Sequence, residues 1–140
     1  MTARNLLVGK RIIRIDLEES REAIRFYLSD GSAAIAQCQA ECCSHTWIED
    51  ILDPEAALDV VLDAKDLALP AAIRQEPTKT GFDEDVMAYY GYAIDTTKGR
   101  CTLAYRNSSN GAYGGNLMWS TDKPYHMKMT WQRLVGDPTL

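Results

Sequence analysis

Long apolar stretches are missing from this sequence. The nearest candidate, Val60-Val61-Leu62, is interrupted at once by Asp63. No stretch approaches the roughly 20 apolar residues that a membrane-spanning helix needs. Residues 1–9 turn polar too soon to serve as a secretory signal peptide. We therefore expect a protein without a membrane partner that stays in the cytoplasm of the cell that makes it.

Positive charge is also scarce. The chain has 15 Lys and Arg against 20 Asp and Glu, a net charge of −5. Proteins that bind long nucleic acids normally present a basic face to the phosphate backbone, so this balance argues against that partner. It leaves room for a small anionic ligand, because one pocket needs only two or three well-placed arginines.

Recognisable catalytic motifs are absent as well. The sequence holds no nucleophile elbow, P-loop, HExxH or dinucleotide fingerprint. Its 2 histidines leave little material for general acid–base chemistry near neutral pH. We expect a protein that is not an enzyme and that uses no cofactor.

The 4 cysteines lack the spaced pairs of ordinary structural zinc sites. Cys38, Cys42 and Cys43 precede His45 closely enough to make a metal site an alternative. The favoured interpretation is a set of free thiols that behave as small buried hydrophobic groups. The neighbouring carboxylates Glu49-Asp50 are interpreted as a solvated acidic turn, because adjacent side chains do not share a face of a strand.

Apolar and polar residues alternate along most of the chain, which predicts β-strands. A length of 140 residues fits one domain, residues 1–140. The Asp30-Gly31 pair is a strong hairpin signal between two predicted strands, and residues 96–99 form a second turn. The predicted strands are residues 10–17, 23–28, 33–39, 86–95, 100–106, 116–119 and 125–135.

Between these halves, Asp53-Pro54 is a suitable start for a helix. Leu58, Val61 and Leu62 follow at helical spacing, although this stretch fits a strand equally well. The expected fold class is α+β and predominantly antiparallel β. It has an N-terminal β-meander and C-terminal hairpins, with one or two short helices between them. The apolar stripe of Met127, Met129 and Trp131 is interpreted as core packing.

The most informative candidate site is the segment at residues 106–115. Its glycine and asparagine residues can direct backbone N–H groups into an anion-binding concavity. A hairpin loop without a function needs the same residue types, so this alternative stays open. The candidate ligand-binding residues here are Arg100, Arg106, Asn107, Asn110, Tyr113 and Arg133.

The order of several short motifs resembles the phage-encoded Thoeris anti-defence protein one family. The resemblance runs from about Val8 to Trp119. Its motifs are Asp30-Gly31, Cys42-Cys43-Ser44, Trp47-Ile48-Glu49-Asp50-Ile51, Tyr90-Gly91-Tyr92, Thr97-Lys98-Gly99 and Ser109-Asn110-Gly111-Ala112-Tyr113.

This resemblance implies a sponge protein for immune signals. Such a protein binds cyclic ADP-ribose isomers without cleaving them, and the resemblance extends to binders of the cyclic oligonucleotides of CBASS signalling. It implies a homo-oligomer, a dimer or a hexamer, that acts in the cytoplasm of an infected bacterial host. Asn110 matches the family's ligand site, while Arg100 stands where the family has an aromatic residue. On charge alone, Arg21 and Arg25 are expected to form a second phosphate site.

Two other classes remain as alternatives. A metal-dependent phosphodiesterase-like enzyme would need a metal cluster or a His/Asp dyad. An inhibitor of phage origin that binds another protein would use exposed strand edges.

Overall fold

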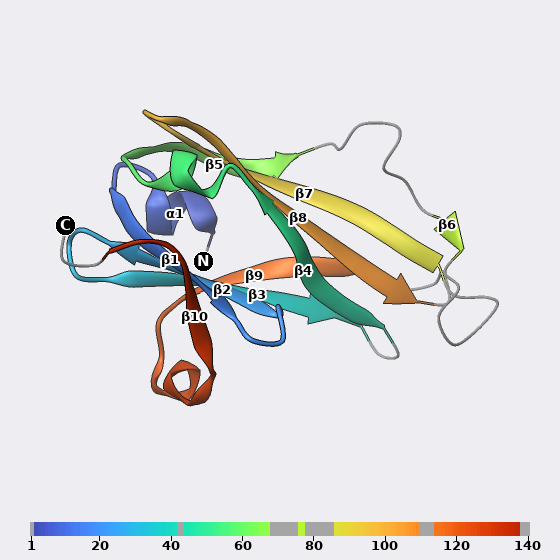
Figure 1. The fold of residues 1–140 in the computed structure, drawn as a ribbon. Helices are drawn as coiled ribbons and strands as arrows, with labels where there is room; N and C mark the ends of the chain where they lie inside the picture. The colour runs from blue at the N-terminus through green and yellow to red at the C-terminus, as the bar shows by residue number, and fades with distance from the viewer. Residues whose placement is uncertain (1, 42–43, 68–75, 78–85, 110–113, 138–140) are drawn as a thin grey trace.

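Antiparallel strands make up most of the protein and form two layers. The structure, a computed structural model, describes residues 2–41, 44–67, 76–77, 86–109 and 114–137. Two sheets lie one over the other (Figure 1), which confirms the predicted fold class. Within the described part of the chain, no helix has the length and apolar character needed to cross a membrane.

Sheet I has the strand order β10-β1-β2-β3-β9. Its strands are β1 (Ile12–Glu18), β2 (Ala23–Leu28), β3 (Ala33–Ala40), β9 (Gly115–Thr121) and β10 (Trp131–Gly136). The first three strands form the predicted meander. Its second turn contains Gly31 at φ +88°, and the Ser32 N–H donates to Asp30 Oδ1 at 2.9 Å. Hydrogen bonds from Ser32 lower the pKa of Asp30 to about 2.

Sheet II has the strand order β4-β8-β7-β5, and β6 also pairs with β7. Its strands are β4 (His45–Leu52), β5 (Val61–Leu67), β6 (Glu76–Pro77), β7 (Val86–Thr96) and β8 (Gly99–Ser109). The predicted turn at residues 96–99 joins β7 to β8. These two strands pair without interruption from Thr96–Gly99 to Val86–Ser109.

The hydrophobic core lies between the sheets. Along β2, Ile24, Phe26 and Leu28 face inward and are buried, as their alternation predicts. From sheet II, Ile94 and Leu103 complete the same cluster. Burying a side chain of this size contributes roughly 1.5–3 kcal/mol, so this shared face fixes which side of each strand turns inward.

The helical segments differ from the prediction. An unpredicted helix, α1 (Ala3–Leu7), begins where Thr2 Oγ1 accepts the Asn5 N–H at 3.2 Å. The helix expected from Asp53-Pro54 is only a four-residue 3-10 turn, η1 (Pro54–Ala57), and Asp53 makes no side-chain cap. The following stretch is β5, because pairing with β7 buries Val61 and Ala64.

The strand predicted over residues 125–135 is wrong in its first half. Pro124–Lys128 is a 3-10 helix, η2, and only Trp131–Gly136 pairs as β10. His126 is the buried residue of η2, and its Nδ1 accepts the Lys123 N–H at 3.0 Å. Met127 is 77% exposed, so the predicted apolar core stripe is also wrong. The hydrogen bond between Lys123 and His126 stabilises the 3-10 helix, although the alternation of apolar and polar residues here is typical of a strand.

Two predicted turns are strand instead. Asn107 was expected in a loop, but β8 continues to Ser109 and turns Asn107 into the core. There, Asn107 Nδ2 donates to Thr46 Oγ1 at 2.9 Å. The Glu49-Asp50 turn is also part of a strand, β4, because β8 supplies hydrogen-bonding partners along its length. A register shift between Ile48 and Asp50 leaves both carboxylates exposed.

Candidate functional site

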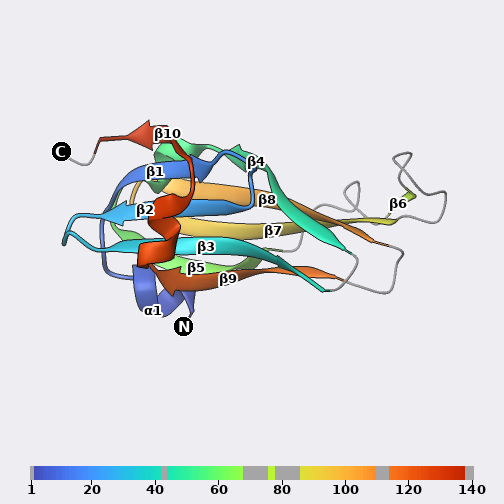
Figure 2. The ribbon, with the colours of Figure 1, turned by 90° about the horizontal axis from the view of Figure 1, so that it is seen from below.

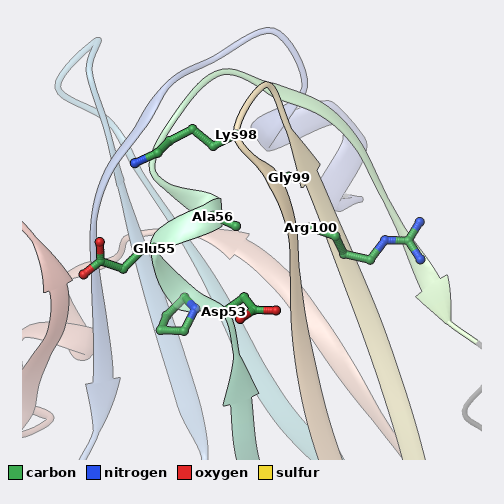
Figure 3. A pocket seen from close by; sticks show the side chains of 7 residues that line it. Asp53, Glu55, Ala56, Lys98, Gly99 and Arg100 are labelled. Atoms are coloured by element: carbon green, nitrogen blue, oxygen red, sulfur yellow. The ribbon is translucent and has the colours of Figure 1, made fainter.

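Arg100 lies at one end of the outer face of sheet II. Its Nε and Nη2 donate to the Asp95 carboxylate at 2.6 and 3.1 Å. It borders a surface pocket of about 660 Å³, which is lined by Asp53, Pro54, Glu55, Ala56, Lys98, Gly99 and Arg100. Figure 3 shows the Lys98 and Arg100 side chains pointing to opposite sides. The carboxylates of Asp53 and Glu55 also line this pocket. The two cations, Lys98 and Arg100, are therefore not arranged to bind one anion together.

Arg106 lies on the same outer face, six residues further along β8. At 3.2–3.4 Å per residue, this spacing separates the Arg100 and Arg106 backbones by about 20 Å. The Arg106 guanidinium lies 4.6 Å from the centre of the Tyr89 ring and 3.5 Å from Glu49 Oε1. Asn107 faces the opposite side, in the core. The structure therefore does not bring these three predicted residues into one pocket.

The two arginines predicted to form a second phosphate site contact the protein itself. Arg21 adopts φ +66° and donates to the Ile48 and Glu49 carbonyl oxygens at 2.7 and 2.8 Å. Arg25 is buried against Trp131, with its guanidinium 4.3 Å from the ring centre. These contacts tie the β1–β2 turn to β4 and hold β10 on sheet I.

The remaining predicted site residues are not connected to these groups. Arg133 is exposed on β10 in sheet I. Within the described ranges, no hydrogen bond, ion pair or ring contact joins it to Arg100 or Arg106. Asn110 and Tyr113 lie outside the described residues. Their part in ligand binding stays a prediction.

The cysteines described by the structure are free thiols in protected positions. Cys101 is part of the core, where burial raises its pKa to about 12. Burial also raises the pKa of Cys38 to about 12. Cys42 and Cys43 lie outside the described residues. Among the residues that are described, no group of three or more His, Cys, Asp or Glu side chains is placed to hold a metal ion.

An aromatic cavity lies between the two sheets. It is found where β9 runs beside α1, two elements that Figure 2 shows next to each other. We call it the inter-sheet cleft. Its volume is about 350 Å³, within the range of about 300–1,000 Å³ that small-molecule sites occupy. The cleft is lined by Thr2, Ala3, Asp66, Tyr92, Tyr105, Asn116, Leu117 and Trp119.

Strand register places the aromatic walls of the inter-sheet cleft. Tyr90 pairs with Tyr105 across β7 and β8, and their rings stack at 5.0 Å. Tyr92 lies two residues further along the same face, and its ring centre is 5.3 Å from that of Trp119 on β9. Trp119 also stacks on Phe26 at 5.6 Å. These contacts hold the rings rigidly, and Tyr92, Tyr105 and Trp119 are 8%, 4% and 7% exposed.

Polar groups of the inter-sheet cleft are incompletely satisfied. Trp119 Nε1 is buried and has no hydrogen-bond partner among the described residues. Asp66 pairs with Tyr92 in the β5–β7 register. Burial, with the Asp66 charge as a further cause, raises the pKa of Tyr92 to about 12. The same two causes raise the pKa of Tyr105, so both phenols are neutral at physiological pH.

A second cavity adjoins this one, and we call it the entry groove. It has a volume of about 510 Å³ and is lined by Thr2, Arg4, Asn5, Ala64, Lys65, Asp66 and Tyr92. Three of these residues also line the inter-sheet cleft. Arg4 Nε lies 2.9 Å from Asp63 Oδ1, and Lys65 Nζ lies 3.8 Å from Asp63 Oδ2. Aromatic walls therefore lead out to two exposed cationic side chains.

The sequence prediction missed this site. Residues 86–95 were correctly predicted as an aromatic strand, but no binding role was given to Tyr92 or to Tyr105. Alternation on the two strands was the available signal, since it places both rings on the inward face. Asp66 and Trp119 carried no such signal, because only the pairing of β5 with β7 and the stacking of the sheets bring them together.

Comparison with known proteins gives a family but no function. No curated protein and no solved structure matches the chain. The sequence pattern of a family described as a domain of unknown function, DUF7448, matches residues 5–119. The match ends at Trp119 and leaves out η2 and β10. Because it spans most of the 140 residues, the chain belongs to the DUF7448 family.

Proposed function

We propose that this protein binds a small cyclic nucleotide and releases it chemically unchanged. The observation that carries the proposal is the continuity of the inter-sheet cleft with the entry groove. Aromatic side chains line the cleft, and a nucleobase that stacks on such a ring gains roughly 1–3 kcal/mol. Arg4 and Lys65 lie where a phosphate attached to that base would emerge.

The ligand class comes from the motif resemblance. It implies cyclic ADP-ribose isomers, with CBASS cyclic oligonucleotides as a further possibility, sequestered as immune signals. In this proposal the protein acts as a homo-oligomer in the cytoplasm of an infected bacterium and lets the phage evade defence. A cyclic ligand loses little internal freedom on binding, which favours the tight binding that a sponge requires.

Thermal-shift measurements with cyclic ADP-ribose and cyclic di-AMP test binding. A ligand at 100 times its dissociation constant adds about 2.7 kcal/mol of stability. For a domain of this size that corresponds to a rise in Tm of about 8–12 °C. Mass spectrometry of the ligand after denaturation then tests catalysis. Intact ligand supports sequestration, whereas an opened or hydrolysed product contradicts it and favours the phosphodiesterase alternative. Absence of any shift with either nucleotide contradicts the proposal.

Charge-removing variants locate the ligand. Arg4→Ala and Lys65→Ala are expected to weaken binding about three- to tenfold each, because both side chains are exposed and their phosphate contacts are partly screened. Lys128→Ala, in η2, is the matched control and should bind normally. Arg100→Ala, Arg106→Ala and Arg133→Ala test the residues predicted from sequence. Loss of binding in these three, with Arg4→Ala and Lys65→Ala unaffected, would move the site to the arginines predicted from sequence.

A further inference from the structure

The free edges of the two sheets differ in how they are protected. An edge strand leaves one row of main-chain N–H and C=O groups unpaired, and folded proteins usually block that row. The strand orders end on β10 and β9 in sheet I and on β4 and β5 in sheet II. On β4, the register shifts between Ile48 and Asp50. Arg21 covers the same edge, because its carbonyl oxygen accepts the Ile48 N–H at 2.7 Å and its side chain donates to the Ile48 and Glu49 carbonyl oxygens.

The edges formed by β5 and β10 are protected as well. On β5, the register shifts between Val61 and Asp63, and Asp63 Oδ1 accepts the Ala64 N–H at 2.9 Å. Along β10, the pairing with β1 skips Leu134, and the neighbouring Arg133 is exposed and charged. Register shifts and charges of this kind interrupt the regular row of groups that another strand would need.

Within the described residues, β9 has none of these protections, although it is an edge strand of sheet I (Figure 2). Its seven residues, Gly115–Thr121, pair with β3 without a register shift, and none of them is charged. The next N–H, that of Asp122, points to β3 and donates to the Ala33 carbonyl oxygen at 3.2 Å. By alternation, the main-chain groups of Leu117 and Trp119 point away from β3. No hydrogen bond occupies them in the part of the chain that the structure describes.

We propose that two copies of this chain pair antiparallel along their β9 strands and extend sheet I across a two-fold dimer. This inference rests on the homo-oligomer of the proposed function and assigns its contact surface. A two-fold axis at Met118 places Leu117 of one copy opposite the partner's Trp119. In that register, the outward N–H and C=O groups of these two residues bond to each other. Both side chains belong to the core side of the strand, so the inward faces of the two copies match.

The distribution of charge favours a second copy as the partner. The chain has a net charge of −5, so two copies repel each other over much of their surface. Pairing along β9 brings no like charges opposite each other, because the strand has no charged side chain. Met118 is 40% exposed, and in the dimer it would lie against the partner's Met118. These two residues form a non-hydrogen-bonded pair, the closer type of antiparallel pair, with Cα atoms about 4.5 Å apart.

Size-exclusion chromatography with light scattering, followed over a dilution series of the full-length protein, tests this contact. The wild-type protein should form a dimer or a larger assembly built from that dimer. Met118→Lys should raise the dissociation constant of this contact at least about tenfold, because two like charges then face each other in a close pair. Met118→Glu should do the same, and an equal mixture of the two variants should restore association, because a lysine then faces a glutamate. Met127→Lys is the matched control. Met127 is 77% exposed on η2, so this variant should associate as the wild type does.

The outcomes separate the contact surface from the rest of the proposed function. A wild-type protein that stays monomeric at every concentration overturns both the β9 contact and the proposed homo-oligomer. If Met118→Lys associates as tightly as the wild type, the β9 contact is overturned while the homo-oligomer stands. If the two charged variants stay apart when mixed, pairing centred on Met118 is overturned. Nucleotide binding is measured separately by thermal shift, so its failure would leave this result unchanged. Thermal unfolding of each variant confirms that it has folded.

Discussion

The most sensitive ion pair in this fold is expected to be the one between Arg25 and its two carboxylate partners. Arg25 Nη1 lies 3.2 Å from Asp122 Oδ2, and Nη2 lies 3.8 Å from Asp16 Oδ2. The Arg25 side chain is 11% exposed and that of Asp16 is 1% exposed. The guanidinium also lies 4.3 Å from the centre of the Trp131 ring. Arg25→Ala therefore removes a charge and a packing surface from a poorly solvated site.

The size of the effect follows from these contacts. Removing one partner of a fully buried pair costs about 3–5 kcal/mol. Asp16 keeps a second cation, Arg14, whose Nε lies 2.7 Å away, so about 2 kcal/mol of that cost is expected. Loss of the ring contact adds about 0.5–1 kcal/mol. Together, Arg25→Ala should lower the free energy of unfolding by about 3 kcal/mol.

Urea denaturation followed by circular dichroism measures this loss. The free energy of unfolding decreases by about 1.5 kcal/mol per molar urea, so the urea midpoint of unfolding should fall by about 2 M. Arg100→Ala is the matched control. Arg100 is also in an ion pair, with the one carboxylate of Asp95, but its side chain is 43% exposed, so the urea midpoint should hardly move. Equal effects of the two substitutions, or a loss below about 1 kcal/mol for Arg25→Ala, would refute the argument from burial.

Two further predictions concern acid stability and backbone geometry. Burial lowers the pKa of His126, so the unfolded chain binds its proton more readily. Stability should then be fully present above pH 6.5 and fall as the pH drops below it. His126→Gln should reduce this dependence, which is measured as the difference between the urea midpoints at pH 7.5 and pH 5.5. Gly31 and Gly136 both adopt φ +88°. At Gly31 no atom lies within 4 Å of the position that a Cβ would take, whereas at Gly136 the Cβ would collide with the Ile13 carbonyl. In thermal unfolding, Gly31→Ala should cost about 1 kcal/mol and Gly136→Ala about 3 kcal/mol, and equal costs would show that the collision relaxes freely.

Local sequence signals were sufficient to predict the strands that have one face in the core. The alternation of residues 23–28 and the Asp30-Gly31 turn predict β2 and its hairpin because the turn and the buried face agree. The same pattern misled the interpretation of residues 125–135. There, Pro124 and the His126 cap favour a 3-10 turn, and Met127 has no core to face.

The candidate site depended on information that no short segment contains. Tyr92 and Tyr105 belong to a predicted hairpin, but Asp66 joins them only when β5 pairs with β7. Trp119 comes from the other sheet and contacts Tyr92 only after the two layers stack. The predicted arginines were chosen for charge, and the structure shows that Arg21 and Arg25 use it for internal contacts. The sequence shows that an arginine is charged, but it does not show whether a group of the protein itself already pairs with that charge.

The course of β9 explains why a cavity forms at this edge of the two sheets. At the start of the strand the sheets approach so closely that a Cβ on Gly115 would collide with the Thr46 side chain on β4. Further along β9, Leu117 and Trp119 line the inter-sheet cleft instead. Because the sheets are in tight contact at Gly115, a ligand in the proposed function would enter from the other side, where residues of α1 and β5 line the entry groove. The residue that opens α1, Thr2, lines both cavities there. The base of a nucleotide held between the sheets would therefore lead its phosphate toward the exposed cations of the entry groove.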